Sequence, residues 1–227
     1  MIEASEYIDE IVTLMDSTIL GKYDYTNSRT YFCDTKWARV GKLITDSNHN
    51  IFRITEVVTD TYIVAKHNSD PSYILDGLCE LENPFFMTGT KLATNREWTL
   101  ADSNLENKLP LIWLLEIIKE TGYGKGSSFE RDIEAKVFFL DETDPSQYYT
   151  KQNREQVVKP MQKLMNEFIK TIDKIREYKT LESYKYKTFS RFGVEQDNGV
   201  FQNILDANLS GVALEITLTR YKENCKC

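Results

Sequence analysis

The longest regular pattern of apolar and polar positions lies in residues 154–178. Apolar side chains recur there at steps of three and four residues, at Val157, Val158, Met161, Leu164, Met165, Phe168, Ile169, Ile172 and Ile175. This spacing is typical of an amphipathic helix with one wide apolar stripe. Lys159 and Lys163 are among the polar residues in between, which predict a solvated opposite face. A helix this long and one-sided needs a sheet to pack against.

Patterns on both sides of that helix predict the sheet. In residues 133–140, apolar side chains at odd positions alternate with Glu134, Lys136 and Phe138, which indicates a half-buried strand. Residues 212–219 alternate in the same way. The continuous apolar run 109–115 favours a strand covered on both faces, with a buried helix as the alternative. We expect one sheet with the 154–178 helix on one face.

The first half of the chain has a different pattern. Apolar spacing predicts an amphipathic helix over residues 2–20, with Gly21 as its stop. Residues 22–106 are rich in short β-favouring runs separated by polar turns. Residues 51–58 and 61–65 form the clearest hairpin, with Thr59 and Asp60 at the turn. Further strands are expected within 39–45 and 85–98.

The last quarter of the chain is predicted to be mostly irregular before its final strand. A short strand is expected within 188–194, and residues 195–211 are expected to be mainly loop, with a turn at 197–199. The predicted class is therefore α+β: a mixed, mainly antiparallel sheet with the long helix and the N-terminal helix packed on it, plus a β-rich insertion. Residues 1–21 and 107–227 would form the core, and residues 22–106 the insertion.

The charge balance limits the classes of partner. The 227 residues include 28 Lys and Arg against 35 Asp and Glu, giving a formal charge of −7. An acidic chain argues against a general nucleic-acid-binding surface. No run approaches the roughly 18–20 apolar residues of a membrane span, and the N-terminus lacks the basic region of a secretion signal. We therefore expect a protein that begins in a cytoplasm.

Few residues offer metal or nucleophile chemistry. The four cysteines, at positions 33, 79, 225 and 227, are too sparse for a disulfide framework, so free thiols are expected. The only histidines are His49 and His67, both in polar, turn-like surroundings. Neither a histidine zinc site nor a Ser-His or Cys-His pair is therefore expected. We expect no cofactor and no bound metal.

Two other segments invite a ligand-binding interpretation. The Gly-rich loop 122–128 could cradle a phosphate, but Lys125 is followed by Gly126 and the chain then enters a strand, so the pattern of a P-loop is not met. Asp141, Glu142 and Asp144 form an acidic cluster that could hold Mg²⁺. An Asp-Pro sequence after a strand is, however, more typical of a strand end and helix start.

One motif suggests an enzyme. Glu134-Ala135-Lys136 on a strand followed by a helix resembles the catalytic strand of PD-(D/E)xK nucleases, in which an upstream acid completes a metal site. Glu116 is the available acid. Alternating charges on a half-exposed strand are common, so we expect Glu134 and Lys136 to face solvent without a catalytic role.

The order of elements along the chain supports a second resemblance. This resemblance depends on the runs 109–114, 134–140 and 211–218, together with the N-terminal helix and the long helix with Pro160 near its start. In this order the chain resembles the tail-terminator and tail-completion proteins of long-tailed phages, over residues 2–20 and about 109–221. Residues 22–106 have no counterpart in the smaller members of that family.

The resemblance implies a structural virion protein rather than an enzyme. It implies a homo-oligomeric ring in the neck or tail, assembled in the host cytoplasm, which terminates the tail tube or joins it to the head–tail connector. Its partners would be copies of itself, other neck and tail proteins, and genomic DNA passing through the lumen without specific binding. No membrane is involved. A metal-dependent nuclease and a monomeric β-rich adaptor are the alternatives.

Two segments are candidates for contacts between subunits. The loop 122–128 and the segment 195–211 are long, carry Gly or Asn, and lie between well-patterned strands, which is unusual unless they bind something. The candidate contact residues are Tyr123, Lys125, Phe201 and Asn208.

Overall fold

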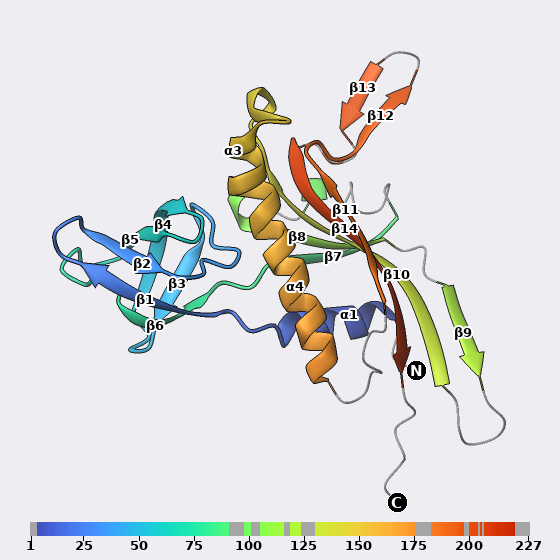
Figure 1. Ribbon diagram of the computed structural model, residues 1–227, viewed down its shortest axis with the longest axis horizontal. Helices are drawn as coiled ribbons and strands as arrows, with labels where there is room; N and C mark the ends of the chain where they lie inside the picture. Colours follow the sequence, from blue (N-terminus) through green and yellow to red (C-terminus); the bar gives the residue numbers. More distant parts are fainter. Residues whose placement is uncertain are drawn as a thin grey trace, which may run out of the picture.

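The computed structural model describes residues 4–90, 98–100, 105–115, 119–123, 130–175, 183–197, 200–203, 205 and 207–220. It has two parts, a small closed β-barrel and a larger mixed sheet with helices (Figure 1). The six barrel strands follow one another in the chain and precede the first strand of the sheet. No helix within these ranges is long and apolar enough to cross a membrane.

The barrel consists of six strands. They are β1 (Thr18–Asp24), β2 (Arg29–Phe32), β3 (Leu43–Asp46), β4 (Ile51–Val58), β5 (Tyr62–His67) and β6 (Gly77–Leu81). Their order is β1-β2-β5-β4-β3-β6, and β6 pairs back with β1, so every neighbouring pair is antiparallel and the barrel closes. The predicted hairpin of residues 51–65 is confirmed as β4 and β5. Alternate side chains, such as Phe32, Phe52 and Ile63, fill the interior.

The N-terminal helix is shorter than predicted. Helix α1 (Ala4–Thr13) buries Ile8, Ile11 and Val12 as expected, but residues 18–24 form β1 and not the end of the helix. Gly21 is therefore not a helix stop. It pairs with Phe32 on the adjacent strand β2, and a Cβ atom there would lie 2.4 Å from Cε1 of the Phe32 ring. The glycine leaves room for that ring in a narrow interior.

The sheet strands begin earlier in the chain than predicted. They are β7 (Phe85–Gly89), β8 (Leu111–Leu115), β9 (Lys119–Tyr123), β10 (Glu130–Glu142), β11 (Lys185–Phe189) and β14 (Leu209–Arg220). The order is β11-β14-β10-β8-β7, with β9 paired to β10. Only β7 and β8 are parallel among these pairs. The sheet is therefore mixed and mainly antiparallel, as predicted, and the class is α+β.

The boundaries of the β-rich part differ from those predicted. The barrel runs from residue 18 to residue 81, whereas the expected insertion was 22–106. Strand β7 belongs to the sheet because its backbone pairs with β8 over five residues. Trp98 also packs in a cluster on the sheet, with Leu111 and Trp113. The expected strand over 85–98 is thus limited to 85–89, and residues 91–97 lie outside the described residues.

The long helix is confirmed, with an earlier end. A helical run starts at α3 (Lys151–Asn153), continues through a π-helical segment (Arg154–Val158), and becomes α4 (Lys159–Lys174). Its stripe is buried at Met161, Leu164, Met165, Phe168 and Ile172. Ile175 has an extended backbone, so the helix ends four residues before the predicted position 178. Helix α4 lies across the sheet, over β10 and β14 (Figure 1).

Both faces of the sheet are covered along part of their length. The face under α4 shares one apolar cluster with the barrel interior and α1. A second cluster covers the other face, where Trp113 stacks on Phe138 at 5.1 Å and Phe192 contacts both rings. Strand β10 is consequently half-buried only near Glu134 and Lys136; beyond them it is covered on both sides. The prediction of a half-buried strand over 133–140 was correct for its first half.

Candidate assembly surface

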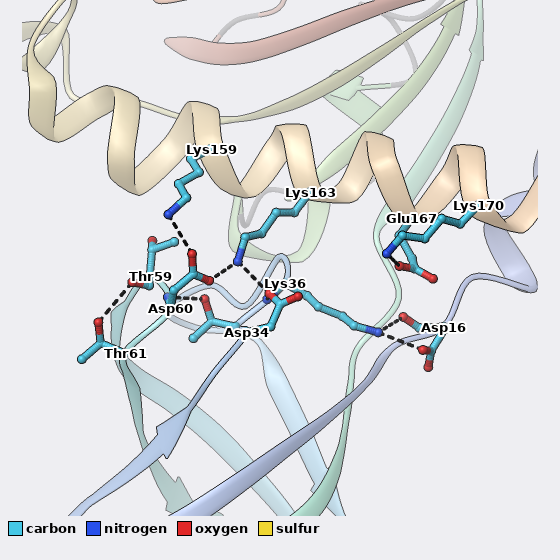
Figure 2. Close-up of polar contacts among 11 residues, drawn as sticks. Asp16, Asp34, Lys36, Thr59, Asp60, Thr61, Lys159, Lys163, Glu167 and Lys170 are labelled. Atoms are coloured by element: carbon cyan, nitrogen blue, oxygen red, sulfur yellow. Dashed lines mark hydrogen bonds and ion pairs between the residues drawn. The ribbon is translucent and has the colours of Figure 1, made fainter.

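A polar junction holds the barrel against α4. Lys159 and Lys163 reach from the helix to Asp60, at the β4–β5 turn, and Lys163 also binds Asp34 at 2.7 Å (Figure 2). The prediction that these lysines lie on a solvated face is therefore correct for Lys159, which is exposed, and wrong for Lys163, which these contacts half-bury. Burial alone would raise the pKa of Asp60, but the hydrogen bonds from the two lysines outweigh it and hold that pKa below its usual range. The lysines neutralise barrel carboxylates and are not free to bind an anion.

The acidic cluster at the end of β10 has internal partners. Asp141 accepts an ion pair from Arg39 Nε at 2.7 Å, and Glu142 binds the same guanidinium at 2.9 Å. Asp144 accepts a hydrogen bond from the backbone N–H of Ser146 and caps a 3-10 turn, as the Asp-Pro sequence predicted. Burial raises the pKa of Asp141, and Arg39 opposes that rise. This cluster is a second tie between barrel and sheet.

The strand motif that suggested a nuclease is part of a ladder of opposite charges. Glu134 pairs with Lys119 of β9 at 3.3 Å, and Lys136 pairs with Glu215 of β14 at 2.7 Å. Glu116, the acid considered for a metal site, lies outside the described residues. Within the described ranges no three His, Cys, Asp or Glu side chains are grouped as a metal ion would require. Cross-strand pairing accounts for both members of the motif.

Strand β11 is an edge strand that is exposed on both faces until its last residue, Phe189, which packs against the apolar cluster around Trp113. It pairs with β14 on one side, and no other described strand pairs with it. Every residue from 183 to 188 is exposed, including Tyr184 at 41% and Tyr186 at 55%. A strand whose side chains are exposed on both faces gains little from burial in its own chain. Its backbone edge is open to a further strand.

A hairpin follows β11 directly. Strands β12 (Val194–Asp197) and β13 (Val200–Asn203) pair with each other and with no other described strand, and the hairpin projects beyond one end of the sheet (Figure 1). The expectation that 195–211 is mainly loop was therefore wrong for 195–197 and 200–203, and also for 209–211, which belong to β14. The predicted turn at 197–199 has the right position, since Asp197 faces Val200 in the register. Residues 198 and 199 themselves lie outside the described residues.

Both ends of this hairpin are fixed to the core. Before it, the N–H of Phe192 donates to the carbonyl of Leu209 at 2.7 Å and the Phe192 ring is buried. Gly193 then takes a φ of +68°, a turn that favours glycine, and directs the chain away from β11. After the hairpin, Leu205 is 1% exposed in the same apolar cluster. The hairpin is thus a projecting element with two anchored roots.

The candidate contact residues that the structure describes do not all lie together. Tyr123 is the last residue of β9, opposite Glu130, whereas Phe201 is on β13, and the two strands are at opposite ends of the sheet (Figure 1). Asn208 is half-buried at the root of the hairpin, where its carbonyl accepts from the Thr143 N–H at 2.8 Å. Lys125 and most of the loop 122–128 lie outside the described residues; Gly122 belongs to β9.

The short strand expected within 188–194 lies at 185–189 instead, and its open edge was not recognised as a surface for another strand. The signal was present in Lys185-Tyr186-Lys187-Thr188-Phe189, in which two lysines alternate with the β-favouring residues Tyr186 and Thr188. Such a run predicts a strand with little apolar surface to bury. In comparisons with protein-family models, curated proteins and solved structures, nothing matches this chain.

Proposed function

We propose that this chain is a structural subunit of the neck or tail of a long-tailed phage. Copies of it assemble into a ring that terminates the tail tube or joins it to the head–tail connector. The observation that supports this function most directly is that, among the described residues, no further strand pairs with the outer edge of β11 or with the β12–β13 hairpin. The proposal involves no catalytic step, cofactor or membrane.

Both elements favour association with another chain. A two-stranded hairpin is at best marginally stable alone in water, so a projecting one gains stability from a neighbour. An open strand edge invites pairing with another chain. A closed ring needs two different surfaces on each subunit, so that one surface of each copy contacts the other surface of the next. The chain offers both kinds of surface.

The charge distribution is compatible with a DNA channel. A formal charge of −7 disfavours a tight grip on phosphates, which would hinder DNA passing through the ring. Several of the basic side chains are also neutralised, because Lys159, Lys163, Arg39 and Lys136 are bound to carboxylates. Other neck and tail proteins would contact the remaining surface, including the barrel.

The mass of the assembly tests the proposal. Native mass spectrometry and sedimentation over a series of protein concentrations, with the isolated chain and with co-expressed neck proteins, should detect one closed multiple of 26.4 kDa. A chain that stays at the monomer mass in every mixture would contradict the ring and favour the monomeric adaptor. An open series of masses without a closed species would contradict it as well.

A cleavage assay tests the enzymatic alternative. With Mg²⁺ or Mn²⁺, the purified protein should leave supercoiled and linear DNA intact. Cleavage that disappears in a Glu134→Ala variant would replace the structural function by a nuclease. The matched control is Glu155→Ala, which removes an exposed carboxylate from the helical run and leaves the β10 ladder unchanged.

A further inference from the structure

We infer that the β12–β13 hairpin is an assembly arm that adds to the open edge of β11 in a second copy of this chain. The contact extends the neighbour's sheet from β11 outward by backbone pairing. The inference rests on the proposed ring, but it names the two surfaces that meet and the interaction that selects them.

The hairpin cannot readily serve its own β11. Only residues 190–193 separate the two elements, and Phe192 within them is buried and bonded to Leu209. Gly193, immediately before β12, has a positive φ of +68°, so the backbone turns between the linker and the hairpin. Ser190 is also fixed, because its carbonyl accepts from the Ser210 hydroxyl at 2.7 Å. The linker therefore holds the hairpin beyond the sheet, where another copy can receive it.

Charge identifies the partner as this same chain. Residues 194–203 contain Glu195 and Asp197 and no basic residue, so the arm carries a formal charge of −2. Residues 183–189 contain Lys185 and Lys187 and no acidic residue, so the receiving edge carries +2. Glu215, which faces Lys185 in the register, is already bound to Lys136. An acidic arm and a basic edge on one chain attract between copies, and like charges keep two arms or two edges apart.

Each copy then contributes one arm and one edge. Arm to edge is a contact between different surfaces, so it propagates from copy to copy and closes if the rotation between copies permits. In this contact the edge of β11 and an edge of the hairpin are paired with each other. Neither is then open to uncontrolled association with other chains. The exposed Tyr184 and Tyr186 flank the lysines and provide apolar area beside the new strand.

A charge exchange tests this contact. Lys185→Glu with Lys187→Glu should weaken self-association by roughly tenfold or more, because two attractive pairs become repulsive. Glu195→Lys with Asp197→Lys should weaken it to a similar extent. All four changes in one chain should restore assembly, since the attraction is re-formed with opposite signs. Raising the salt concentration should weaken wild-type association and the restored variant alike.

The matched control is Lys22→Glu with Lys66→Glu, the same charge change on exposed residues of barrel strands β1 and β5. It should leave association unchanged, and circular dichroism should report the same fold in every variant. A closed ring that forms despite both charge reversals would contradict the contact between arm and β11 and would still support the proposed function. An assembly of two copies that responds to the charge exchange as expected would support that contact and contradict the ring. A wild-type chain that stays monomeric at every concentration would overturn both.

Discussion

Replacing Phe168 by Ala tests whether α4 is packed on the sheet as the structure has it. The Phe168 side chain is fully buried, and its ring lies 5.5 Å from the ring of Phe139 on β10 in an edge-to-face contact. Truncation removes on the order of 120 Å² of buried apolar surface, or about 3 kcal/mol at ~25 cal/mol per Å². The residual cavity and the lost aromatic pair add about 1 kcal/mol. The expected loss of unfolding free energy is therefore about 4 kcal/mol.

Urea unfolding measures this loss. With an m value of about 2–3 kcal/mol/M, the midpoint should fall by roughly 1.5 M. Because one apolar cluster includes Phe168, the sheet and the barrel interior, signals from both parts should shift together. The control is Asn166→Ala, an exposed position on the same helix, which should change the unfolding free energy by less than about 0.5 kcal/mol. A loss below about 1 kcal/mol for Phe168→Ala would refute the packing assignment.

Three further predictions concern the barrel. Gly21→Ala should destabilise the protein by about 1–3 kcal/mol in urea unfolding, because its Cβ would overlap the Phe32 ring. Hydrogen bonds from Thr18 lower the pKa of Asp16 to about 2, assisted by Lys36, so the stabilisation is present above the unfolded pKa of about 4 and lost as pH falls toward 2. The difference in stability between wild type and Asp16→Asn should shrink over that range. Burial raises the pKa of Cys79 to about 12, so alkylation at pH 8 should spare this thiol.

A control measurement checks each of these three predictions. Phe32→Leu combined with Gly21→Ala should recover part of the lost stability, and no recovery would contradict the steric explanation. A stability difference for Asp16→Asn that is constant from pH 5 to pH 2 would contradict the linkage. Cys33 is exposed and should be alkylated in the native protein, whereas Cys79 should react only after unfolding. Peptide mass spectrometry separates the two sites.

The elements with one strong local period could be predicted from the sequence. The stripe of α4, the β4–β5 hairpin and strands β10 and β14 each repeat a pattern set by which side faces the core. The end of α1 could not be predicted in this way. Ile19 satisfies the helical spacing that begins at Ile8, and it also satisfies the two-residue alternation with Gly21 in β1. Pairing with β2 and β6, which are distant in sequence, decides between the two.

Contacts between distant segments account for the other differences. Closure of the barrel depends on pairing of β6 with β1 and β3, and the position of β7 depends on its parallel pairing with β8. Lys163 has the spacing of a solvated helix position, but the barrel places Asp60 and Asp34 beside it. Local periodicity contains no information on which carboxylate approaches which lysine.

The candidate site was predictable only as a region. The length and turn residues of 195–211 indicated a segment that binds something, and part of it forms the β12–β13 hairpin. Its pairing as a hairpin was missed because 194–203 has no strict alternation of apolar and polar residues. The receiving strand β11 was expected three residues too late, at 188–194 and not 185–189, because burial on one face does not mark where a largely exposed strand begins.

A reconstruction of the assembled virion, or of a complex of co-expressed neck proteins, tests the central claim most directly. The account predicts this chain in a closed symmetric ring around a channel, with the β12–β13 hairpin of each copy lying along β11 of the next. Finding the chain outside any symmetric ring, or finding the hairpin and β11 exposed to solvent in the assembled particle, would contradict it.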